Sequence, residues 1–173
     1  MNEIHTSTIS AFVKELENAR KKDNTVFIVG NGGSASTALH MASDLSIGAF
    51  PSDGLPLRVF ALTDNIASMT AIANDFGYEA LFVKQLKSYY KPGDKLIAIS
   101  ASGNSPNVVD AAQWVKNQGG TVMGLIGFDG GKLKSLCNLA IHVKTPIGEY
   151  GPVEDIHVIM DHLIFTWLSH IEQ

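Results

Sequence analysis

Two short stretches of the chain, residues 30–34 and residues 100–105, have the composition of phosphate-binding turns. Their sequences are Gly-Asn-Gly-Gly-Ser and Ser-Ala-Ser-Gly-Asn-Ser, and each follows an apolar run, at 26–29 and 95–99 respectively. Each also leads into a segment with the apolar spacing of a helix. Glycine lets backbone N–H groups approach a ligand, serine adds hydroxyl donors, and the start of a helix favours negative charge. We therefore expect the two turns to hold one polyhydroxylated phosphate from two sides.

Each turn also has a simpler interpretation. The first turn is not the G-x-G-x-x-G fingerprint of dinucleotide-binding proteins, and glycines after a strand are also typical of an ordinary tight turn. The second turn holds Ser100, Ser102 and Ser105 around a glycine, and a polar loop with helix caps would have a similar composition. Three serines, a glycine and a following helix favour phosphate binding for the second turn.

A histidine and a carboxylate follow the first turn at helical spacing. His40 and Asp44 are four residues apart, which places them on one face of the expected helix. Such a pair could bind a metal ion or move protons. It could equally be an ordinary ion pair on the protein surface.

The last helix, expected from about Val153 to Ile171, is rich in groups that can do chemistry. Within nine residues it carries Glu154, Asp155, His157, Asp161 and His162. The spacing does not decide which of them face a site. Glu154 and His162 would lie roughly 12 Å apart along a regular helix axis, at ~1.5 Å per residue. They could share one ligand only if Glu154 sits at the helix entrance and reaches inward.

The elements that must position these residues alternate between strands and helices. Strands are expected at Thr25–Val29, Leu57–Leu62, Lys95–Ile99, Thr121–Ile126 and Leu139–Val143. Helices are expected at 5–22, from Ser34 to near Gly48, and at 66–74, 79–89, 108–118 and 132–136, besides the last helix. This alternation favours an α/β fold in one domain over residues 1–173, with a parallel five-stranded sheet and helices on both faces. Ligands of such sheets bind beyond the carboxyl ends of the strands, where both turns lie.

Composition excludes several classes of partner. The net charge of −4 provides no basic field to hold a nucleic acid. No apolar run reaches the ~20 residues that span a bilayer, and no basic-then-apolar leader opens the chain. The single cysteine, Cys137, rules out an intrachain disulfide and lies in an apolar stretch, where a buried and inert thiol is expected. We expect a soluble, cytoplasmic protein that binds neither nucleic acid nor membrane.

Four ordered motifs resemble those of a known family. They are residues 30–34, 73–78 (Ala-Asn-Asp-Phe-Gly-Tyr), 100–108 and 127–131 (Gly-Phe-Asp-Gly-Gly). Together they are similar to the sugar isomerase (SIS) domain proteins, and most to the phosphoheptose isomerases, from Phe27 to about Leu168. The resemblance implies a flavodoxin-like sheet and a homotetramer with active sites between subunits. It also implies conversion of sedoheptulose 7-phosphate to D-glycero-D-manno-heptopyranose 7-phosphate, a step toward lipopolysaccharide or capsule heptose.

The resemblance further implies roles for particular residues. The expected substrate contacts are Asn31, Gly32 and Ser34 of the first turn, the acidic residue Asp75, the second-turn residues Ser100, Ala101, Ser102 and Ser105, and Glu154. The expected metal ligands, around one zinc ion per site, are His40, Asp44, Glu154 and His162. Four positions depart from the family pattern: Asp44 stands where Glu is usual, Glu154 where Gln is usual, Gly151 where an acidic residue is common, and Ala101 lacks the usual hydroxyl.

An aldose–ketose isomerase of this family would act through a cis-enediol, with Asp44 as the base and His162 as the partner acid. Zinc binding and proton transfer compete for the oxygens of Asp44, and both uses stay open. Two other functions also stay open: a non-catalytic SIS module that binds a sugar phosphate or an initiator protein, and an isomerase of another sugar phosphate. The first helix, within residues 1–22, is expected to serve in oligomerisation.

Overall fold

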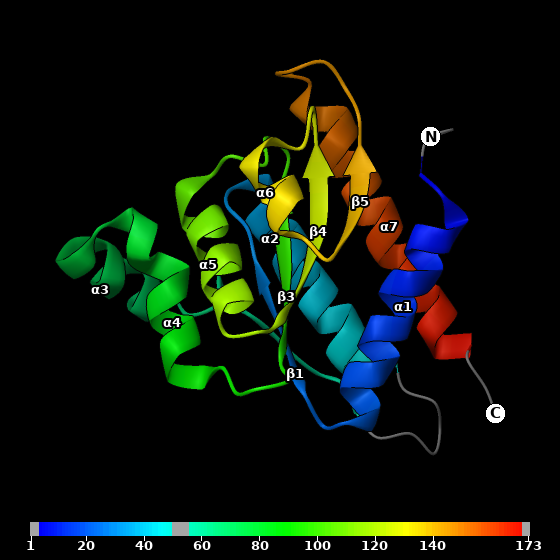
Figure 1. The fold of residues 1–173 in the computed structure, drawn as a ribbon, viewed down its shortest axis with the longest axis horizontal. Coiled ribbons are helices and arrows are strands. Elements are labelled where there is room, and N and C mark those ends of the chain that lie inside the picture. The colour runs from blue at the N-terminus through cyan, green and yellow to red at the C-terminus, as the bar shows by residue number, and fades with distance from the viewer. Residues whose placement is uncertain (1–3, 50–55, 171–173) are drawn as a thin grey trace.

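A parallel sheet forms the centre of the protein (Figure 1). The computed structural model describes residues 4–49 and 56–170 of the chain, so the loop that the proline and glycine at 51–54 predict lies outside the described residues. The strands are β1 (Thr25–Val29), β2 (Arg58–Ala61), β3 (Lys95–Ser100), β4 (Thr121–Gly127) and β5 (Leu139–Val143). Within the described residues they form one parallel sheet in the order β2-β1-β3-β4-β5. This is the flavodoxin-like order, and it confirms the predicted fold.

The strand order reverses at the pair β1 and β3. These two strands are hydrogen-bonded neighbours, with Val26 opposite Lys95 and Val29 opposite Ala98. The first glycine–serine turn follows β1 and the second follows β3. Doubly wound sheets bind their ligands at this reversal point. The fold therefore brings the two turns to the same place at the carboxyl edge of the sheet.

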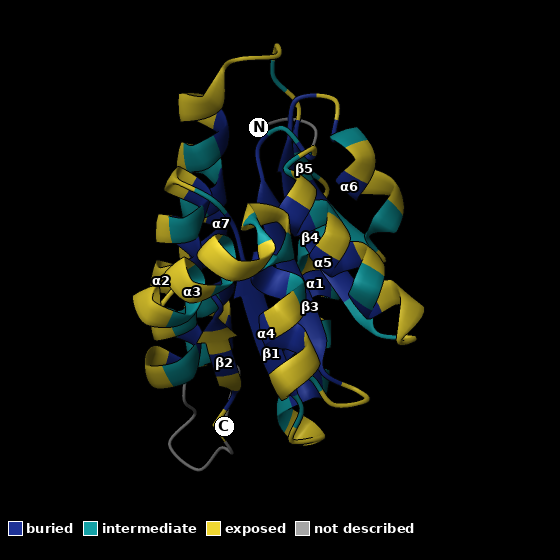
Figure 2. Ribbon diagram, turned by 90° about the vertical axis from the view of Figure 1, so that its left-hand side faces the viewer, coloured by how far each residue is buried: buried dark blue, intermediate teal, exposed yellow. Residues whose placement is uncertain are grey.

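Helices cover both faces of the sheet. One face carries α1 (Thr6–Lys21), α2 (Gly33–Ser43) and α7 (Tyr150–His170). The other carries α4 (Leu81–Tyr89), α5 (Pro106–Asn117) and α6 (Gly131–Leu136). In Figure 1, α3 (Ile66–Phe76) and the short 3-10 helix η2 (Tyr78–Ala80) stand at the opposite edge from α1 and α7. Figure 2 shows that α3 is largely exposed.

Alternate residues of the strands supply the two halves of the core. Val26 and Ile28 of β1 pack toward α1, α2 and α7, whereas Phe27 and Val29 pack toward α4 and α5. Every residue of β1 and of β3 is buried. Parallel strands covered on both faces have this continuous apolar character. The sheet is therefore a rigid frame for the turns at its carboxyl edge.

Two helix boundaries bear on the site. The expected helix from Ser34 to near Gly48 is α2 followed by a π-helical turn, η1 (Asp44–Gly48). The last helix begins at Tyr150, three residues before the predicted start, and Pro152 fits in its first turn because the N–H groups there need no helical partner.

In the described part of the chain, no helix is long and apolar enough to cross a membrane.

Candidate functional site

The second turn folds into a hydroxyl-lined loop at the start of α5. The Oγ atom of Ser100 accepts a hydrogen bond from the Gly103 N–H at 3.1 Å and donates to Ser105 Oγ at 3.5 Å. Ser102 Oγ accepts the N–H of Asn104 at 3.2 Å. Among the described residues, the hydroxyl of Ser105, which is the N-cap residue of α5, caps no helical N–H group. The start of α5 is therefore available to an anion.

The motif at 127–131 supports the second turn from one side. Gly103 has φ +63°, and a Cβ there would overlap with the carbonyl oxygen of Gly130. The Leu133 N–H donates to Gly103 O at 2.9 Å, and the Lys132 N–H donates to Asn104 Oδ1 at 3.1 Å. A side chain at position 103 would strain the backbone and push the two loops apart. This packing explains why the glycine-rich motif accompanies the serine-rich turn.

Two asparagine side chains join the first turn to the second. Asn31 Nδ2 donates to Asn107 Oδ1 at 2.8 Å, and Asn107 Nδ2 donates to Asn31 Oδ1 at 2.9 Å. The hydroxyl of Tyr78, from η2, donates to the same Asn31 Oδ1 at 2.9 Å. The sequence does not predict Asn107 or Tyr78 as a site residue, although each lies within one of the four motifs. The carboxamide of Asn31 is thus held in a defined orientation at the edge of the sheet.

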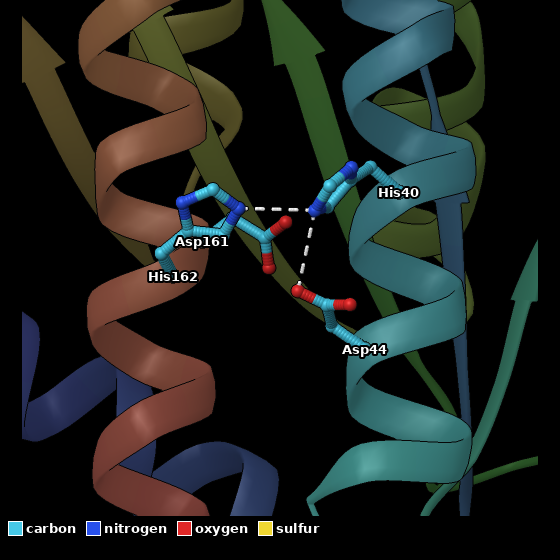
Figure 3. Close-up of side chains that lie close together, drawn as sticks. All are labelled: His40, Asp44, Asp161 and His162. Carbon is cyan, nitrogen blue, oxygen red and sulfur yellow. Dashed lines mark hydrogen bonds and ion pairs between the residues drawn. The ribbon is translucent and has the colours of Figure 1, made fainter.

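A cluster of two histidines and two carboxylates lies between α2 and α7 (Figure 3). His40 and Asp44 come from α2 and η1, and Asp161 and His162 come from α7. The Nε2 atoms of His40 and His162 are 3.0 Å apart, and Asp44 Oδ2 is 3.3 Å from His40 Nε2. One ligand atom from each of the four residues lies within 4.8 Å of the others. We call these four residues the His–Asp cluster.

The geometry of the His–Asp cluster suits a divalent metal ion. Ligand atoms of a tetrahedral site with bonds of ~2.0–2.1 Å are about 3.3 Å apart, close to the two short separations in the cluster. Imidazole and carboxylate ligands are those that zinc and similar ions accept. Asp44 also opens the π-helical turn η1, and such turns occur often at functional sites.

Asp161 is the buried member of the cluster. Its side chain is fully buried, and neither carboxylate oxygen has a hydrogen-bond partner among the residues at 4–49 and 56–170. Burial, assisted by the charge of Asp44, raises the pKa of Asp161 to about 7. A buried carboxyl group without a partner is costly, and a bound cation would compensate for it. The residues present therefore fit a metal ion.

The sequence reasoning noted Asp161 on the last helix but gave it no role. The buried residues of α7 form one stripe: Val153, His157, Met160, Asp161, Ile164 and Leu168. A carboxylate on a largely apolar stripe, directly before His162, is the signal that identifies it. His157 on the same stripe is buried, and its Nε2 is 3.4 Å from Ile126 O. Burial lowers the pKa of His157 to about 4.

Glu154, expected both as a substrate contact and as a metal ligand, lies outside the His–Asp cluster. A Cβ at Gly33 would overlap with its carboxylate, so Glu154 rests against the first residue of α2. Glu154 and His40 line a shallow hollow of about 270 Å³ that also includes Gly33, Ser36 and Thr37. The structure therefore places Glu154 beside the first turn, on the side that leads to His40.

The other expected substrate contacts are spread over the site region. Ser34 is buried in the first turn of α2, and Gly32 is the N-cap residue of that helix. The side chain of Ala101 is buried in an apolar cluster with Phe128, Val143 and Val153, so only its backbone could face a ligand. Asp75 is exposed on α3, where it accepts a hydrogen bond from Asn74 at 2.8 Å, and α3 packs against η2 and α4. The described chain thus does not bring Asp75 into the cluster.

The fold and its two turns define a SIS-domain protein, and the family model described as "SIS domain" matches residues 1–127. Two similar curated proteins are named phosphoheptose isomerase. The one from Pelobacter propionicus is 39% identical over 150 residues, covering 85% of this chain and 79% of that protein. The one from Rhodospirillum rubrum is 39% identical over 139 residues, covering 80% and 72% respectively. The chain therefore belongs to the phosphoheptose isomerase family, as the resemblance of its motifs predicted.

A solved structure agrees with this assignment. The phosphoheptose isomerase from Neisseria gonorrhoeae superposes on this chain with a TM-score of 0.88 at 28% sequence identity. The match covers 98% of this chain and 89% of that chain. The similarity thus extends over the sheet, both turns and the helices that carry the His–Asp cluster.

Proposed function

We propose that the protein is an aldose–ketose isomerase that converts sedoheptulose 7-phosphate to D-glycero-D-manno-heptopyranose 7-phosphate. One structural observation carries the proposal: the helix that begins at the first turn, α2, also presents His40 and leads to Asp44. A sugar held by its phosphate at the neighbouring second turn would therefore have its other end near groups that can accept and donate protons. Holding the remote phosphate converts binding free energy into positioning of the reacting carbons.

The proposed reaction needs one proton acceptor and one donor. The open-chain ketose loses a proton from C1 to a carboxylate oxygen of Asp44, and the proton on O1 moves to O2, which gives the cis-enediolate with its negative charge on O1. Asp44 then returns a proton to C2, and the C1–O1 bond becomes the aldehyde carbonyl. His162 is placed to exchange the hydroxyl proton, since its ring nitrogen faces the same space as Asp44 and His40. General acid–base catalysis of this kind contributes about 10²–10⁴-fold to the rate.

The proposal includes one zinc ion, held by His40, Asp44 and His162. When bound, zinc would polarise the sugar carbonyl and stabilise negative charge on the enediol oxygens. One oxygen of Asp44 can bind the ion while the other accepts a proton. The chain's own contribution is then to hold the phosphate at the serine turn and the sugar hydroxyls at Asn31 and Glu154.

We further propose a homotetramer in the cytoplasm with active sites completed between subunits, serving heptose synthesis for lipopolysaccharide or capsule. The exposure of α3 supports shared sites, because Asp75 stands on that helix and reaches no cluster residue within the described chain. A second subunit could bring its α3 to the carboxyl edge of the sheet. The first helix, α1, lines an apolar hollow with α7 and is the proposed oligomerisation surface.

The test is an isomerisation assay with sedoheptulose 7-phosphate. Wild type should turn over, and Asp44→Asn and His162→Ala should each lose at least about 100-fold in kcat. Asp110→Asn, an exposed carboxylate on α5, and His170→Ala, an exposed histidine on α7, are matched controls that should retain full activity. Near-normal turnover by both Asp44→Asn and His162→Ala would reject the proposed roles. Tight sugar-phosphate binding by wild type without turnover of any sugar phosphate would instead favour a non-catalytic SIS module.

A further inference from the structure

We infer that Asp161 is the fourth ligand of the metal ion, which makes the site a centre of two histidines and two carboxylates in which Glu154 takes no part. The inference deepens the proposed function and rests on it for the presence of a metal ion. It differs from the ligand set that the motifs implied, in which Glu154 completes the site.

The first argument is the direction of the Asp161 side chain. Figure 3 shows its carboxylate pointing from α7 into the space between His162, His40 and Asp44. The rest of the stripe around it, Met160 and Ile164 included, packs into the apolar core. A carboxylate in this position cannot reach water, and its two oxygens have no hydrogen-bond donor anywhere in the described residues. A cation bound between α2 and α7 would give the Asp161 carboxylate a partner and would bind side chains of both helices at once.

The second argument is the convergence of lone pairs. His40 Nε2 faces both His162 Nε2 at 3.0 Å and Asp44 Oδ2 at 3.3 Å. A single proton on one ring nitrogen can make only one good hydrogen bond among these three atoms. Two carboxylates that face the same space also repel each other. A divalent cation at the centre receives lone pairs from all four residues and turns this repulsion into attraction.

The third argument is the charge and hardness of the donors. Two carboxylates carry the two negative charges that neutralise a divalent ion, and the two imidazoles add neutral nitrogen ligands. A set of two nitrogens and two oxygens suits zinc and neighbouring divalent ions such as cobalt and manganese, but not ions that require thiolates. Cobalt can therefore replace zinc as a spectroscopic probe of the same ligands.

The position of Glu154 separates it from this centre. Glu154 precedes Asp161 by seven residues, which is roughly 10 Å along the helix axis at ~1.5 Å per residue. Its carboxylate rests against Gly33 at the start of α2, whereas Asp44 stands at the other end of that helix. Glu154 is therefore free to contact sugar hydroxyls at the first turn while Asp161 holds the metal ion.

The experiment measures metal affinity in the absence of any sugar phosphate. The full-length chain is stripped with a chelator and titrated with Zn²⁺ against a chromogenic competitor, and Co²⁺ spectra are recorded in parallel. Asp161→Asn should weaken Zn²⁺ binding by at least about 10-fold, because losing a ligand costs no less than losing an outer-shell partner. Its Co²⁺ spectrum should change as well. Glu154→Ala, which removes the oxygen donor that a glutamine would keep, should stay within about twofold of wild type in affinity and keep the wild-type spectrum.

Asp155→Asn is the matched control, since it removes a carboxylate from the exposed side of the same helix, and it should bind Zn²⁺ as wild type does. Thermal melting of each metal-free variant checks that it is folded. If Asp161→Asn does not fold, Glu154→Ala still decides, because a large loss of Zn²⁺ affinity in that variant overturns the inference. Wild-type affinity in a folded Asp161→Asn, or no Zn²⁺ binding by wild type, also overturns it.

The outcome is distinguishable from failure of the proposed function. Turnover of sedoheptulose 7-phosphate together with unchanged Zn²⁺ affinity in Asp161→Asn overturns the ligand assignment and leaves the isomerase standing. Loss of affinity in Asp161→Asn in a protein that isomerises no sugar phosphate supports the ligand assignment and rejects the reaction.

Discussion

Asn31 and Asn107 exchange two side-chain hydrogen bonds, of 2.8 Å and 2.9 Å, across the gap between the two turns. Asn107 is 1% exposed and also accepts the N–H of Val108 at 3.0 Å through its Oδ1 atom. Asn107 therefore links the first turn to the start of α5 at the carboxyl edge of the sheet. This relationship fixes the distance between the parts of the site that would hold the sugar and those that would hold its phosphate.

Asn107→Ala should destabilise the protein by about 1–3 kcal/mol, because it removes a buried carboxamide and leaves the half-buried carboxamide of Asn31 without this partner. It should also raise KM for the sugar phosphate more than it lowers kcat, since Asn31 loses its orientation. Denaturant unfolding and steady-state kinetics measure the two effects. The matched control is Gln113→Ala, which removes an exposed amide hydrogen bond to Asn117 on the same helix and should cost less than about 0.5 kcal/mol. Equal effects of the two substitutions would contradict the proposed bridge.

Ser105→Ala should weaken phosphate binding without affecting the fold. The Ser105 hydroxyl caps no helical N–H group within residues 4–49 and 56–170, so its removal breaks little besides the long contact to Ser100. A hydrogen bond to a charged group contributes about 1.5–3 kcal/mol, which corresponds to roughly a 10–150-fold weaker affinity. Calorimetry with inorganic phosphate measures the loss. Ser88→Ala, at an exposed position of α4, is the control, and a Ser105→Ala affinity equal to that of Ser88→Ala would rule out the anion role.

The strands and turns of the site could be predicted because each is encoded locally. The runs at 26–29 and 96–99 are apolar throughout and are followed by glycine and serine, which is typical of the carboxyl end of a strand buried on both faces. That His40 and Asp44 lie on one face could be predicted from their spacing alone, because side chains four residues apart in a continuous helix are neighbours. Such features need no knowledge of which strand pairs with which.

Asp161 and Asn107 could not be predicted in the same way. The role of Asp161 depends on the rotational phase of α7, which decides whether a carboxylate faces water or the space beside His40. The role of Asn107 depends on β1 pairing with β3, because this pairing brings Asn107 beside Asn31, which is 76 residues away in the sequence. Spacing along the chain carries neither kind of information, so only the three-dimensional arrangement revealed them.

In the metal-free protein, His157 and Asp161 should shift stability with pH in opposite directions. Burial lowers the pKa of His157 from 6.5 to about 4, so the unfolded state binds more protons and stability falls as the pH drops through this window. Burial and the charge of Asp44 raise the pKa of Asp161 from 3.8 to about 7. Here the folded state binds more protons, so the contribution of Asp161 is present below pH 3.8 and is lost as the pH rises through 7.

Asp161→Asn should therefore gain stability relative to wild type as the pH rises from 4 to 8, because only wild type must ionise a buried carboxyl group. Urea unfolding with a chelator present, at several pH values across this range, measures the difference. Asp155→Asn serves as the control, because its carboxylate is exposed and its difference from wild type should not vary with pH. A stability difference between Asp161→Asn and wild type that stays constant would show that Asp161 does not titrate as its burial predicts.

The exposed apolar residues of α7 indicate a subunit interface. A single charged substitution among them should therefore dissociate the oligomer. Ile159, Leu163 and Trp167 follow one another at intervals of four residues and are 45%, 43% and 60% exposed. Leu163 and Trp167 also line an apolar hollow of about 320 Å³ with residues of α1.

Trp167→Glu would place a charge in a buried interface, which costs far more than it does on a surface. Light scattering should show wild type at roughly four times the 18.6 kDa of the chain and Trp167→Glu at a smaller mass. Tyr89→Glu, on the opposite face of the sheet and 57% exposed, should keep the wild-type mass. A monomeric wild type, or an unchanged mass for Trp167→Glu, would show that α1 and α7 do not form the subunit interface.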